Sequence, residues 1–154
     1  MRFLLMLMLT FFLLKAEGGL EVTSKDFIYK EGSGKADFIG EVFAKNGETV
    51  LYCDKLTVLL DAQNEAKKYI ATGNVSFNIK NSKKRRDISG TCEKVTHLPK
   101  KDIYILVGNV VLHDNIKNRD VFGDEVVIDN KKGTSKAKSN TKKPVKFIFK
   151  TNTK

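Results

Sequence analysis

The chain has 154 residues, of which 41% are hydrophobic and 30% charged, with two prolines, two cysteines and no tryptophan. This apolar fraction is too high for a fully disordered chain, the two prolines exclude a proline-rich linker, and the length fits one small domain. Twenty-eight Lys and Arg against 18 Asp and Glu give a formal net charge of +10.

The first predicted element is an export signal at residues 1–16. Arg2 supplies a positive start, and residues 3–14 are apolar except for one threonine. A secretory signal peptide has this pattern, whereas a transmembrane helix requires about 20 apolar residues. We expect cleavage near Ala16 and export; an uncleaved anchor at residues 3–14 is the alternative. Cleavage removes two of the 28 bases and no acid, which leaves a net charge of +8.

Two sequence units alternate along the rest of the chain. The first unit occurs at residues 69–77 (YIATGNVSF) and 104–112 (YILVGNVVL), with Tyr, Ile, Gly, Asn and Val in register, and more weakly around Gly40. The second is a small residue followed by two charged residues and an aliphatic one. Its copies begin at Cys53, Cys92 and Gly123, and a fourth candidate begins at Ser24. Such repetition indicates units that bury their apolar faces by stacking on each other.

Within each unit the apolar residues recur at every second position, as in a half-buried β-strand. Gly73 and Gly108 fall in the middle of their strands, which predicts a bulge or a sharp bend there. Turn signals separate the strands, and the Asn46-Gly47 pair is the strongest hairpin signal. We therefore expect an all-β, antiparallel, repetitive structure of bent strands over residues 17–130.

The C-terminal segment, residues 131–154, differs in composition. From residue 130 to the end there are nine lysines and no acid, with one apolar island at residues 145–149. We expect a solvated segment with one last edge strand at 145–149, which could accept another chain.

Cys53 and Cys92 are the only thiols, and export would place them where disulfides form. Their spacing leaves two alternatives open, a disulfide or two buried free thiols. Neither the cysteines nor His97 and His113 have the spacing of a metal site. We expect no metal and no cofactor.

The alternation of small-acid-Lys-aliphatic strands at Cys53 and Cys92 with Gly-Asn-Val strands at Gly73 and Gly108, behind an export signal, resembles the OstA-like family over about residues 20–129. Two features depart from the pattern: Glu41 replaces the asparagine of the first unit, and the lysine-rich segment has no counterpart. The resemblance implies a β-jellyroll, a V-folded sheet with an open apolar groove that shelters the acyl chains of lipopolysaccharide.

It further implies a periplasmic carrier that bridges inner to outer membrane during lipopolysaccharide export. The implied partners are lipopolysaccharide, an inner-membrane OstA-like anchor protein (LptC-like) of an ABC transporter, the N-terminal domain of an outer-membrane translocon (LptD-like), and further copies stacked end to end. A net charge of +8 suits an anionic, phosphorylated lipid. The basic run at residues 81–86 is the densest candidate for head-group contact, although such a run is usually only a soluble hairpin tip.

For the groove we expect inward-facing aliphatic and aromatic residues, with a dry core as the alternative at each position. These residues are Leu51, Leu56, Val58, Val75, Phe77, Ile79, Val95, Val110, Leu112, Val126 and Ile128. For end-to-end contacts we expect Leu20 and Val22 at the first edge, and Val145, Phe147 and Phe149 at the last.

No sequence motif of an enzyme is present: there is no Gly-x-Ser-x-Gly elbow, phosphate-binding glycine loop or carboxylate pair in an apolar run. We therefore expect no catalysis. Two further hypotheses stay open, a membrane-tethered relative with its anchor at residues 3–14, and an exported basic module that binds acidic polysaccharide or nucleic acid. The second is disfavoured, because Tyr69 and Tyr104 fall on the apolar face while the lysines are scattered; we expect no nucleic acid.

Overall fold

A computed structural model describes residues 19–150, and they form one antiparallel sheet of ten strands. The strands are β1 (Leu20–Thr23), β2 (Asp26–Tyr29), β3 (Lys35–Asn46), β4 (Thr49–Leu60), β5 (Ala66–Asn81), β6 (Arg86–Leu98), β7 (Ile103–Asp114), β8 (Arg119–Asp129), β9 (Thr134–Lys138) and β10 (Lys146–Phe149). The all-β prediction is confirmed. Over this described part of the chain no helix has the length and hydropathy to cross a membrane. The predicted signal at 1–16 lies outside the described residues.

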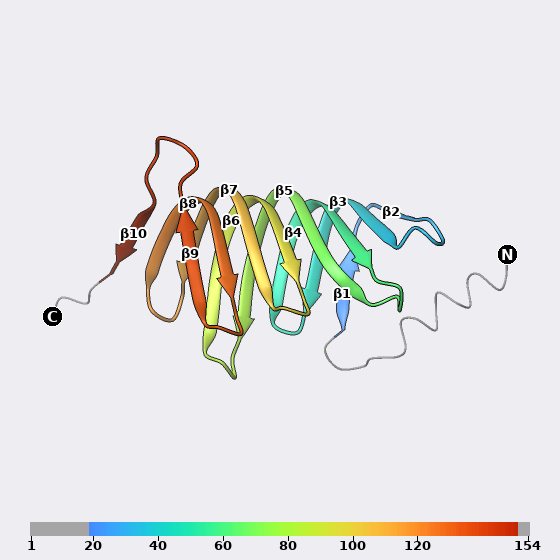
Figure 1. Cartoon of the computed structure of the whole chain (residues 1–154), viewed down its shortest axis with the longest axis horizontal. Helices are drawn as coiled ribbons and strands as arrows, with labels where there is room; N and C mark the ends of the chain where they lie inside the picture. Colours follow the sequence, from blue (N-terminus) through green and yellow to red (C-terminus); the bar gives the residue numbers. More distant parts are fainter. Residues whose placement is uncertain (1–18, 151–154) are drawn as a thin grey trace.

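The sheet is folded into two walls, and each long strand contributes one half to each wall. The second half of β3 pairs with β1 and its first half with β2, while at the other end β8 pairs with β10 and β9 in the same way. We call the wall from β1 to β10 the first wall and that from β2 to β9 the second wall. Figure 1 shows the strands bending over along one side and the hairpin turns lying along the other.

The bend, which we call the crest, falls on the repeated glycine units. The pairing shifts register there in every long hairpin, for example between Thr72 and Val75. In all three units the glycine and the next residue have positive φ, 79° and 47° at Gly73 and Asn74. This left-handed backbone suits Gly, and Asn tolerates it better than most residues. The predicted mid-strand bend is therefore confirmed.

In the units that begin at Cys53 and Cys92, the first charged residue lies against the glycine of the next strand. Asn74 donates a hydrogen bond from Nδ2 to the Asp54 carboxylate at 3.0 Å, and Asn109 does the same to Glu93 at 3.0 Å. A Cβ on Gly73 or Gly108 would lie 2.5 or 2.3 Å from that carboxylate. The two alternating units are thus the two halves of one corner.

The first corner has the same backbone geometry, with an ion pair in place of the amide–carboxylate hydrogen bond. Lys25, second residue of the unit that begins at Ser24, takes the place of the acid, and Glu41 takes the place of the asparagine. The backbone N–H of Lys25 donates to the Gly40 carbonyl at 2.9 Å, and its Nζ lies 3.6 Å from Glu41. The departure at Glu41 is therefore compensated by Lys25.

The lysine-rich segment completes the two walls. β9 and β10 are the two halves of a last bent strand along β8, separated at the crest by a loop at residues 139–145. The Asp124 carboxylate holds this loop, since it accepts hydrogen bonds from the backbone N–H groups of Asn140 and Thr141. A strand lies within the predicted 145–149, whereas β9 was not predicted from the sequence.

Side chains that face between the walls form continuous rows across the strands. One row on the first wall is Val22, Ala44, Leu51, Phe77, Gly90, Leu112, Val121 and Phe147. The facing row on the second wall is Phe27, Phe38, Leu56, Ala71, Val95, Leu106, Val126 and Ala137. These two rows hold eight of the sixteen buried core residues in the described part of the chain, and the core lies in the space between the walls.

Candidate ligand groove

An apolar cavity of about 80 Å³ lies between the walls in the half of the sheet near β1. It is lined by Leu20, Ala44, Asn46, Thr49, Leu51, Leu56, Tyr69, Ala71, Val95, His97 and Tyr104. The floor consists of aliphatic side chains, and Asn46, Thr49 and the rings lie toward the hairpin turns. A cavity with an apolar floor and a polar rim suits an amphiphilic ligand.

Side-chain size explains why the space is in this half. Ala44 and Ala71 occupy inward positions of the two facing rows here, whereas Phe77, Leu112 and Leu106 occupy the same rows farther along. Phe77 and Leu112 are 6% and 5% exposed and Leu106 is fully buried. The half near β8 is therefore closed by direct packing of the walls.

Three aromatic rings stand in one row on the second wall. Tyr69, His97 and Tyr104 are cross-strand neighbours on β5, β6 and β7. The His97 ring is parallel to that of Tyr104 within 7°, with centroids 4.0 Å apart, and lies 5.8 Å from that of Tyr69. The stack forms a rigid aromatic strip beside the cavity.

The stack is held in an uncharged form. Burial lowers the pKa of His97, although Asp102, whose Oδ1 lies 3.8 Å from Nε2, acts in the opposite direction. Burial likewise raises the pKa of the Tyr104 phenol to about 12, with Asp102 adding to the effect and Arg86 opposing it. The side of the groove formed by these rings is therefore neutral at physiological pH.

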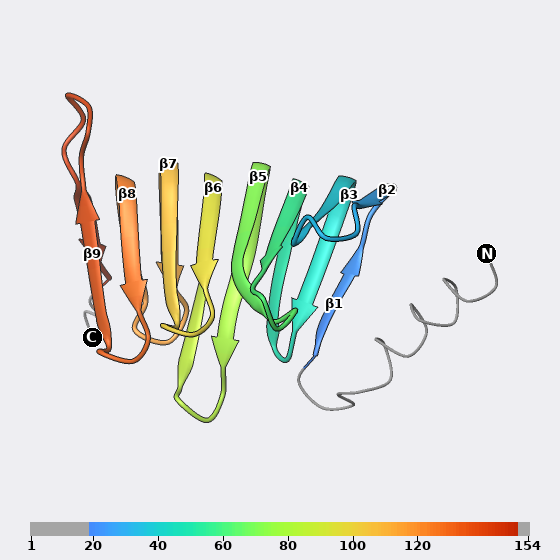
Figure 2. The ribbon, with the colours of Figure 1, turned by 45° about the vertical axis from the view of Figure 1, so that its right-hand side comes forward.

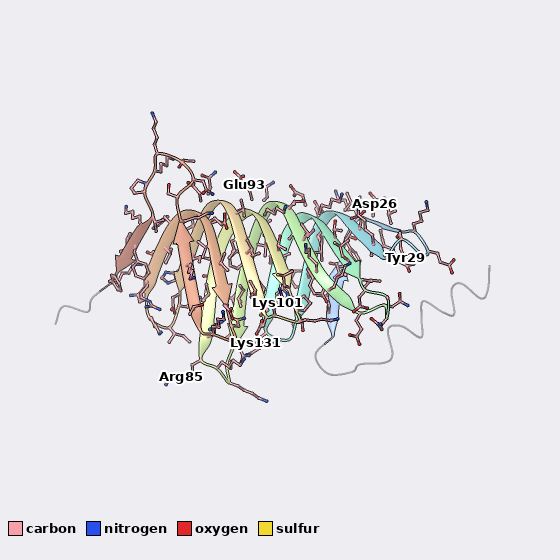
Figure 3. All side chains as sticks on the ribbon, viewed as in Figure 1. Asp26, Tyr29, Arg85, Glu93, Lys101 and Lys131 are labelled. Carbon is pink, nitrogen blue, oxygen red and sulfur yellow. The ribbon has the colours of Figure 1, made fainter. Side chains whose placement is uncertain are left out.

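The side opposite the crest, which we call the mouth, is bordered by hairpin turns: residues 47–48, 82–85 and 115–118 on the first wall, and 61–65, 99–102 and 130–133 on the second. Figure 3 shows Arg85, Lys101 and Lys131 at the mouth, with Glu93 at the crest. Lys100 is bound to Asp61 at 2.9 Å, and this contact lowers the pKa of Asp61. The turns thus carry much of the positive charge.

The residues predicted for the groove all lie in the packed space between the walls. Leu51, Leu56 and Val95 line the cavity. The other eight, namely Val58, Val75, Phe77, Ile79, Val110, Leu112, Val126 and Ile128, are at most 8% exposed and pack on each other. Contact with a lipid stays a prediction for all eleven.

The predicted edge residues lie at opposite ends. Leu20 and Val22 pack against the core from β1, whereas Val145, Phe147 and Phe149 are exposed on or beside β10. The fourth unit, proposed from the sequence at Ser24, contains β2, but Phe27, Ile28 and Tyr29 were not predicted as exposed edge residues.

The lining residues that were missed are the three rings, the two alanines and two polar residues of the rim: Tyr69, His97, Tyr104, Ala44, Ala71, Asn46 and Thr49. A signal for the rings was present, because Tyr69 and Tyr104 are the first residues of the two clearest repeats. His97 is the sixth residue of the unit that begins at Cys92, and Ile128 holds that place in the next copy. Aligning the units puts the two tyrosines at equivalent positions, whereas the place of His97 between them follows only from the strand register.

The disulfide alternative for Cys53 and Cys92 is wrong. Both thiols are free and buried. They lie on β4 and β6, which are separated by β5. Burial raises the pKa of each thiol to about 11, so both remain protonated and behave as small apolar residues of the core. Residues 19–150 contain no cluster of three or more His, Cys, Asp or Glu that could hold a metal ion.

A comparison with protein-family models identifies the family of the chain. Residues 21–134 match the family described as LptA/(LptD N-terminal domain) LPS transport protein. No curated protein sequence matches the chain. The fold resembles the crystal structure of LptH from Pseudomonas aeruginosa, described as the LptA-homologous periplasmic component of the lipopolysaccharide transport device, with a TM-score of 0.76 at 13% identity over 87% of this chain and 96% of that one. Because the match covers most of the sequence, the chain belongs to the LptA/LptD N-terminal domain family of lipopolysaccharide transport proteins.

Proposed function

We propose that the chain is a periplasmic carrier that binds the acyl chains of lipopolysaccharide between its two walls and bridges inner to outer membrane during export. The observation that carries the proposal is the apolar cavity with its polar rim in the half near β1. Each methylene removed from water there contributes about 0.8 kcal/mol. The cavity has room for several water-sized groups, so longer chains require the walls to separate along the closed half.

A bridge between membranes needs copies that stack end to end, and the two ends of the sheet are suited to it. Each wall has an even number of strands in alternating directions, so β10 of one copy and β1 of the next would run antiparallel. In the second wall, the cross-strand pair nearest the crest contains Lys138 at the β9 end and Asp26 at the β2 end, so these two residues lie at the same level. Stacking would therefore bring opposite charges together at one level.

The same continuation would cover the exposed aromatic residues of both ends. Phe149 is 68% exposed and Phe147 is 43% exposed on β10, and Phe27 is 42% exposed on β2. In the stacked register, Ala137 would lie beside Phe27 of the next copy, a small residue against a large one. The anchor protein and the translocon domain, as OstA-like sheets, would dock on the same edges.

Photo-crosslinking during lipopolysaccharide export tests ligand binding. A photoreactive amino acid at Leu51, which lines the cavity, should give lipid adducts. The same amino acid at Tyr52, the next residue and 54% exposed on the outer face, is the matched control and should give none. Adducts of equal yield at both positions, or crosslinks to protein alone, would support a dry core instead. Probes at Phe77 and Leu112 would then report how far the chains extend into the closed half.

The stacking part has its own test. Sedimentation of the exported chain should show a mass that rises with protein concentration, and Phe149→Lys should lower the association. Lys94→Gln, at an exposed position on β6 in the interior of the sheet, is the control that should leave it unchanged. A wild-type chain that stays monomeric at high concentration would contradict end-to-end stacking without affecting lipid binding.

A further inference from the structure

The β5–β6 hairpin projects beyond its neighbours at the mouth. Its pairing continues to Asn81 and Arg86, two residues past Ile79, whereas the adjacent hairpins of the first wall turn at the level of Ile79. At about 3.4 Å per residue this amounts to an overhang of roughly 7 Å. Figure 2 shows this hairpin extending farther than the turns on either side. The overhang places its tip where a ligand in the groove would meet water.

The overhang is strongly basic. Residues 80–86 read KNSKKRR, and none of these five cations forms an ion pair with any residue between 19 and 150. A second cavity, of about 270 Å³, lies at this tip and is lined by Lys80, Ser82, Arg85, Arg86, Asp87 and Ile116. Like charges held together without partners favour an anion.

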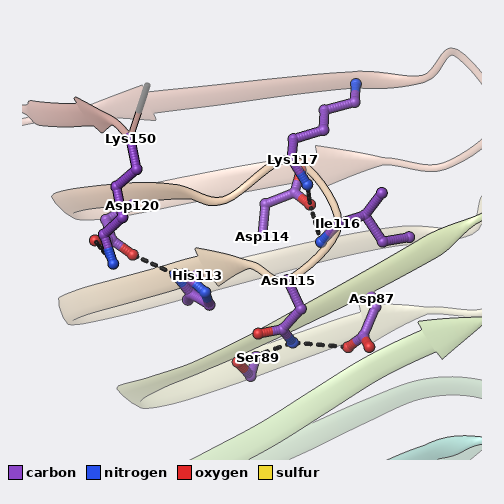
Figure 4. A network of polar contacts seen from close by, with 9 residues as sticks. All are labelled: Asp87, Ser89, His113, Asp114, Asn115, Ile116, Lys117, Asp120 and Lys150. Carbon is purple, nitrogen blue, oxygen red and sulfur yellow. Dashed lines mark hydrogen bonds and ion pairs between the residues drawn. The ribbon is translucent and has the colours of Figure 1, made fainter. Parts of the chain in front are cut away.

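The acids nearby are committed to other contacts. Asp87 accepts hydrogen bonds from the side chains of Asn78 and Asn115, each at 2.8 Å, and Figure 4 shows the second of these. Glu48 accepts from the backbone N–H and the hydroxyl of Ser82. The carboxylates therefore organise the turn and leave the donors of Lys80, Arg85 and Arg86 free of acidic partners.

Arg86 connects this cavity with the groove. Ile79 and its partner Ile88 face the core, and Arg86 lies two residues from Ile88, so its side chain is on the inward side of β6. Its charge acts on the phenol of Tyr104, on the opposite wall. Its Nη1 is shielded from solvent and has no hydrogen-bond partner. Shielded donors are normally paired, so this one leaves a place for an acceptor from a ligand.

We propose that the tip of the β5–β6 hairpin binds a phosphate group of the amphiphile whose acyl chains lie between the walls, with Arg86 as the principal donor and Lys80 and Arg85 around it. A guanidinium presents paired donors that match phosphate oxygens. This inference rests on the proposed function and adds to it the residues that recognise the head group.

The test compares two probes on the full exported chain: a diphosphoryl lipid A and the same lipid with both phosphates removed, at one fixed ionic strength. Arg86→Gln should weaken binding of the phosphorylated lipid by roughly 10-fold to 100-fold, as expected for a charge-assisted hydrogen bond, and leave the dephosphorylated lipid unchanged. If Arg86→Gln folds poorly, Lys80→Gln replaces it as the test variant. Lys80 is exposed, and its substitution should weaken binding of the phosphorylated lipid in the same direction. Lys142→Gln removes the same charge at the crest and should change neither affinity by more than about twofold.

The outcomes separate this inference from the proposed function. If the wild type binds both lipids and neither Arg86→Gln nor Lys80→Gln discriminates between them, the phosphate site is wrong while the carrier stands. If the wild type binds neither lipid, both fail. Inorganic phosphate is the third probe: should it bind as tightly as the phosphorylated lipid and with the same dependence on Arg86, the site serves free phosphate and the head-group assignment is overturned.

Discussion

The two halves of the space between the walls have one backbone and different contents. Both have the same corners and the same antiparallel pairing, yet the half near β1 contains a cavity and the half near β8 is packed. Ala44 and Ala71 stand in the first half at positions of the rows that Phe77 and Leu106 fill in the second. The repeat therefore determines the folded sheet, while the inward residues, which vary between repeats, determine where space remains between the walls.

This contrast has a consequence for transport. A ligand that entered near β1 would meet the packed walls of the closed half. To pass, its acyl chains would have to replace the contacts that Leu106 makes with its neighbours. Such an exchange costs little net free energy, because apolar surface stays covered in both states. Under the proposed function, the packed half would be the unloaded form of the groove.

The largest difference between the halves should appear on truncation of a core leucine. Leu106→Ala creates a void at a fully buried site and should lower the free energy of unfolding by about 2–5 kcal/mol. Leu51→Ala, beside an existing cavity and only partly buried, should cost about 1 kcal/mol. Denaturant unfolding of both variants measures the contrast, and equal losses would mean that the two halves are packed alike.

Glycine at position 90 is a second feature of the closed half. It faces inward between Phe77 and Leu112, and an added Cβ would lie 2.3 Å from the Val111 carbonyl oxygen and 2.9 Å from atoms of both side chains. Gly90→Ala should therefore destabilise the fold by about 1–3 kcal/mol through overpacking. Thermal unfolding measures the loss of stability, with Gly123→Ala as the control because the nearest atom to its added Cβ would be 3.3 Å away. Equal losses of stability in the two variants would contradict tight packing around Gly90.

Enlarging a small residue in the open half should change binding more than stability. Ala44→Leu places a leucine in the cavity lining, where it fills space instead of displacing packed atoms, so the free energy of unfolding should stay within about 1 kcal/mol of the wild type. Affinity for the lipid should fall by about tenfold or more, because the apolar floor is occupied. Paired unfolding and lipid-binding measurements test this, and a variant that binds lipid normally would move the entry point elsewhere.

The sequence predicted the architecture well because the architecture depends on backbone requirements. A left-handed corner accepts few residues, so Gly and Asn recur at Gly73 and Gly108 and can be recognised without a structure. The pair of Lys25 and Glu41 was recognised only through the departure at Glu41, because Lys25 lies far from it in the sequence, in the bend between β1 and β2. Their compensation depends on a contact that one sequence cannot reveal.

The groove was predicted less well for a physical reason. Strand periodicity shows which residues face inward, and it assigned Val75 and Phe77 to that side correctly. It does not show whether two facing residues touch, because this depends on the summed size of side chains on opposite walls. The cavity consequently lies over alanines that no sequence pattern distinguishes. Its three rings come from three different strands, and only the pairing register of those strands shows that the rings are neighbours.

The smallest expected effect is a pH dependence confined to the open half. In the row at the mouth, Val58 and Ile128 cannot titrate, whereas His97 between them has a lowered pKa, chiefly through burial. The folded state therefore binds fewer protons at His97 than the unfolded state, in which the pKa of the imidazole is 6.5. Its contribution to stability is present above that pH and is lost as pH falls through it.

Unfolding measured between pH 7.5 and 5.5 tests this, since carboxylates with lowered pKa values, such as Asp61 and Asp120, lose their contributions at lower pH. His97→Phe keeps an aromatic ring between Tyr69 and Tyr104 and removes the titration, so its stability should fall less than that of the wild type over the same range. A wild type and variant with the same pH dependence would mean that His97 is solvated in the folded state. In that case the walls of the open half would be farther apart than the stacked rings indicate, and the contrast with the closed half would be larger.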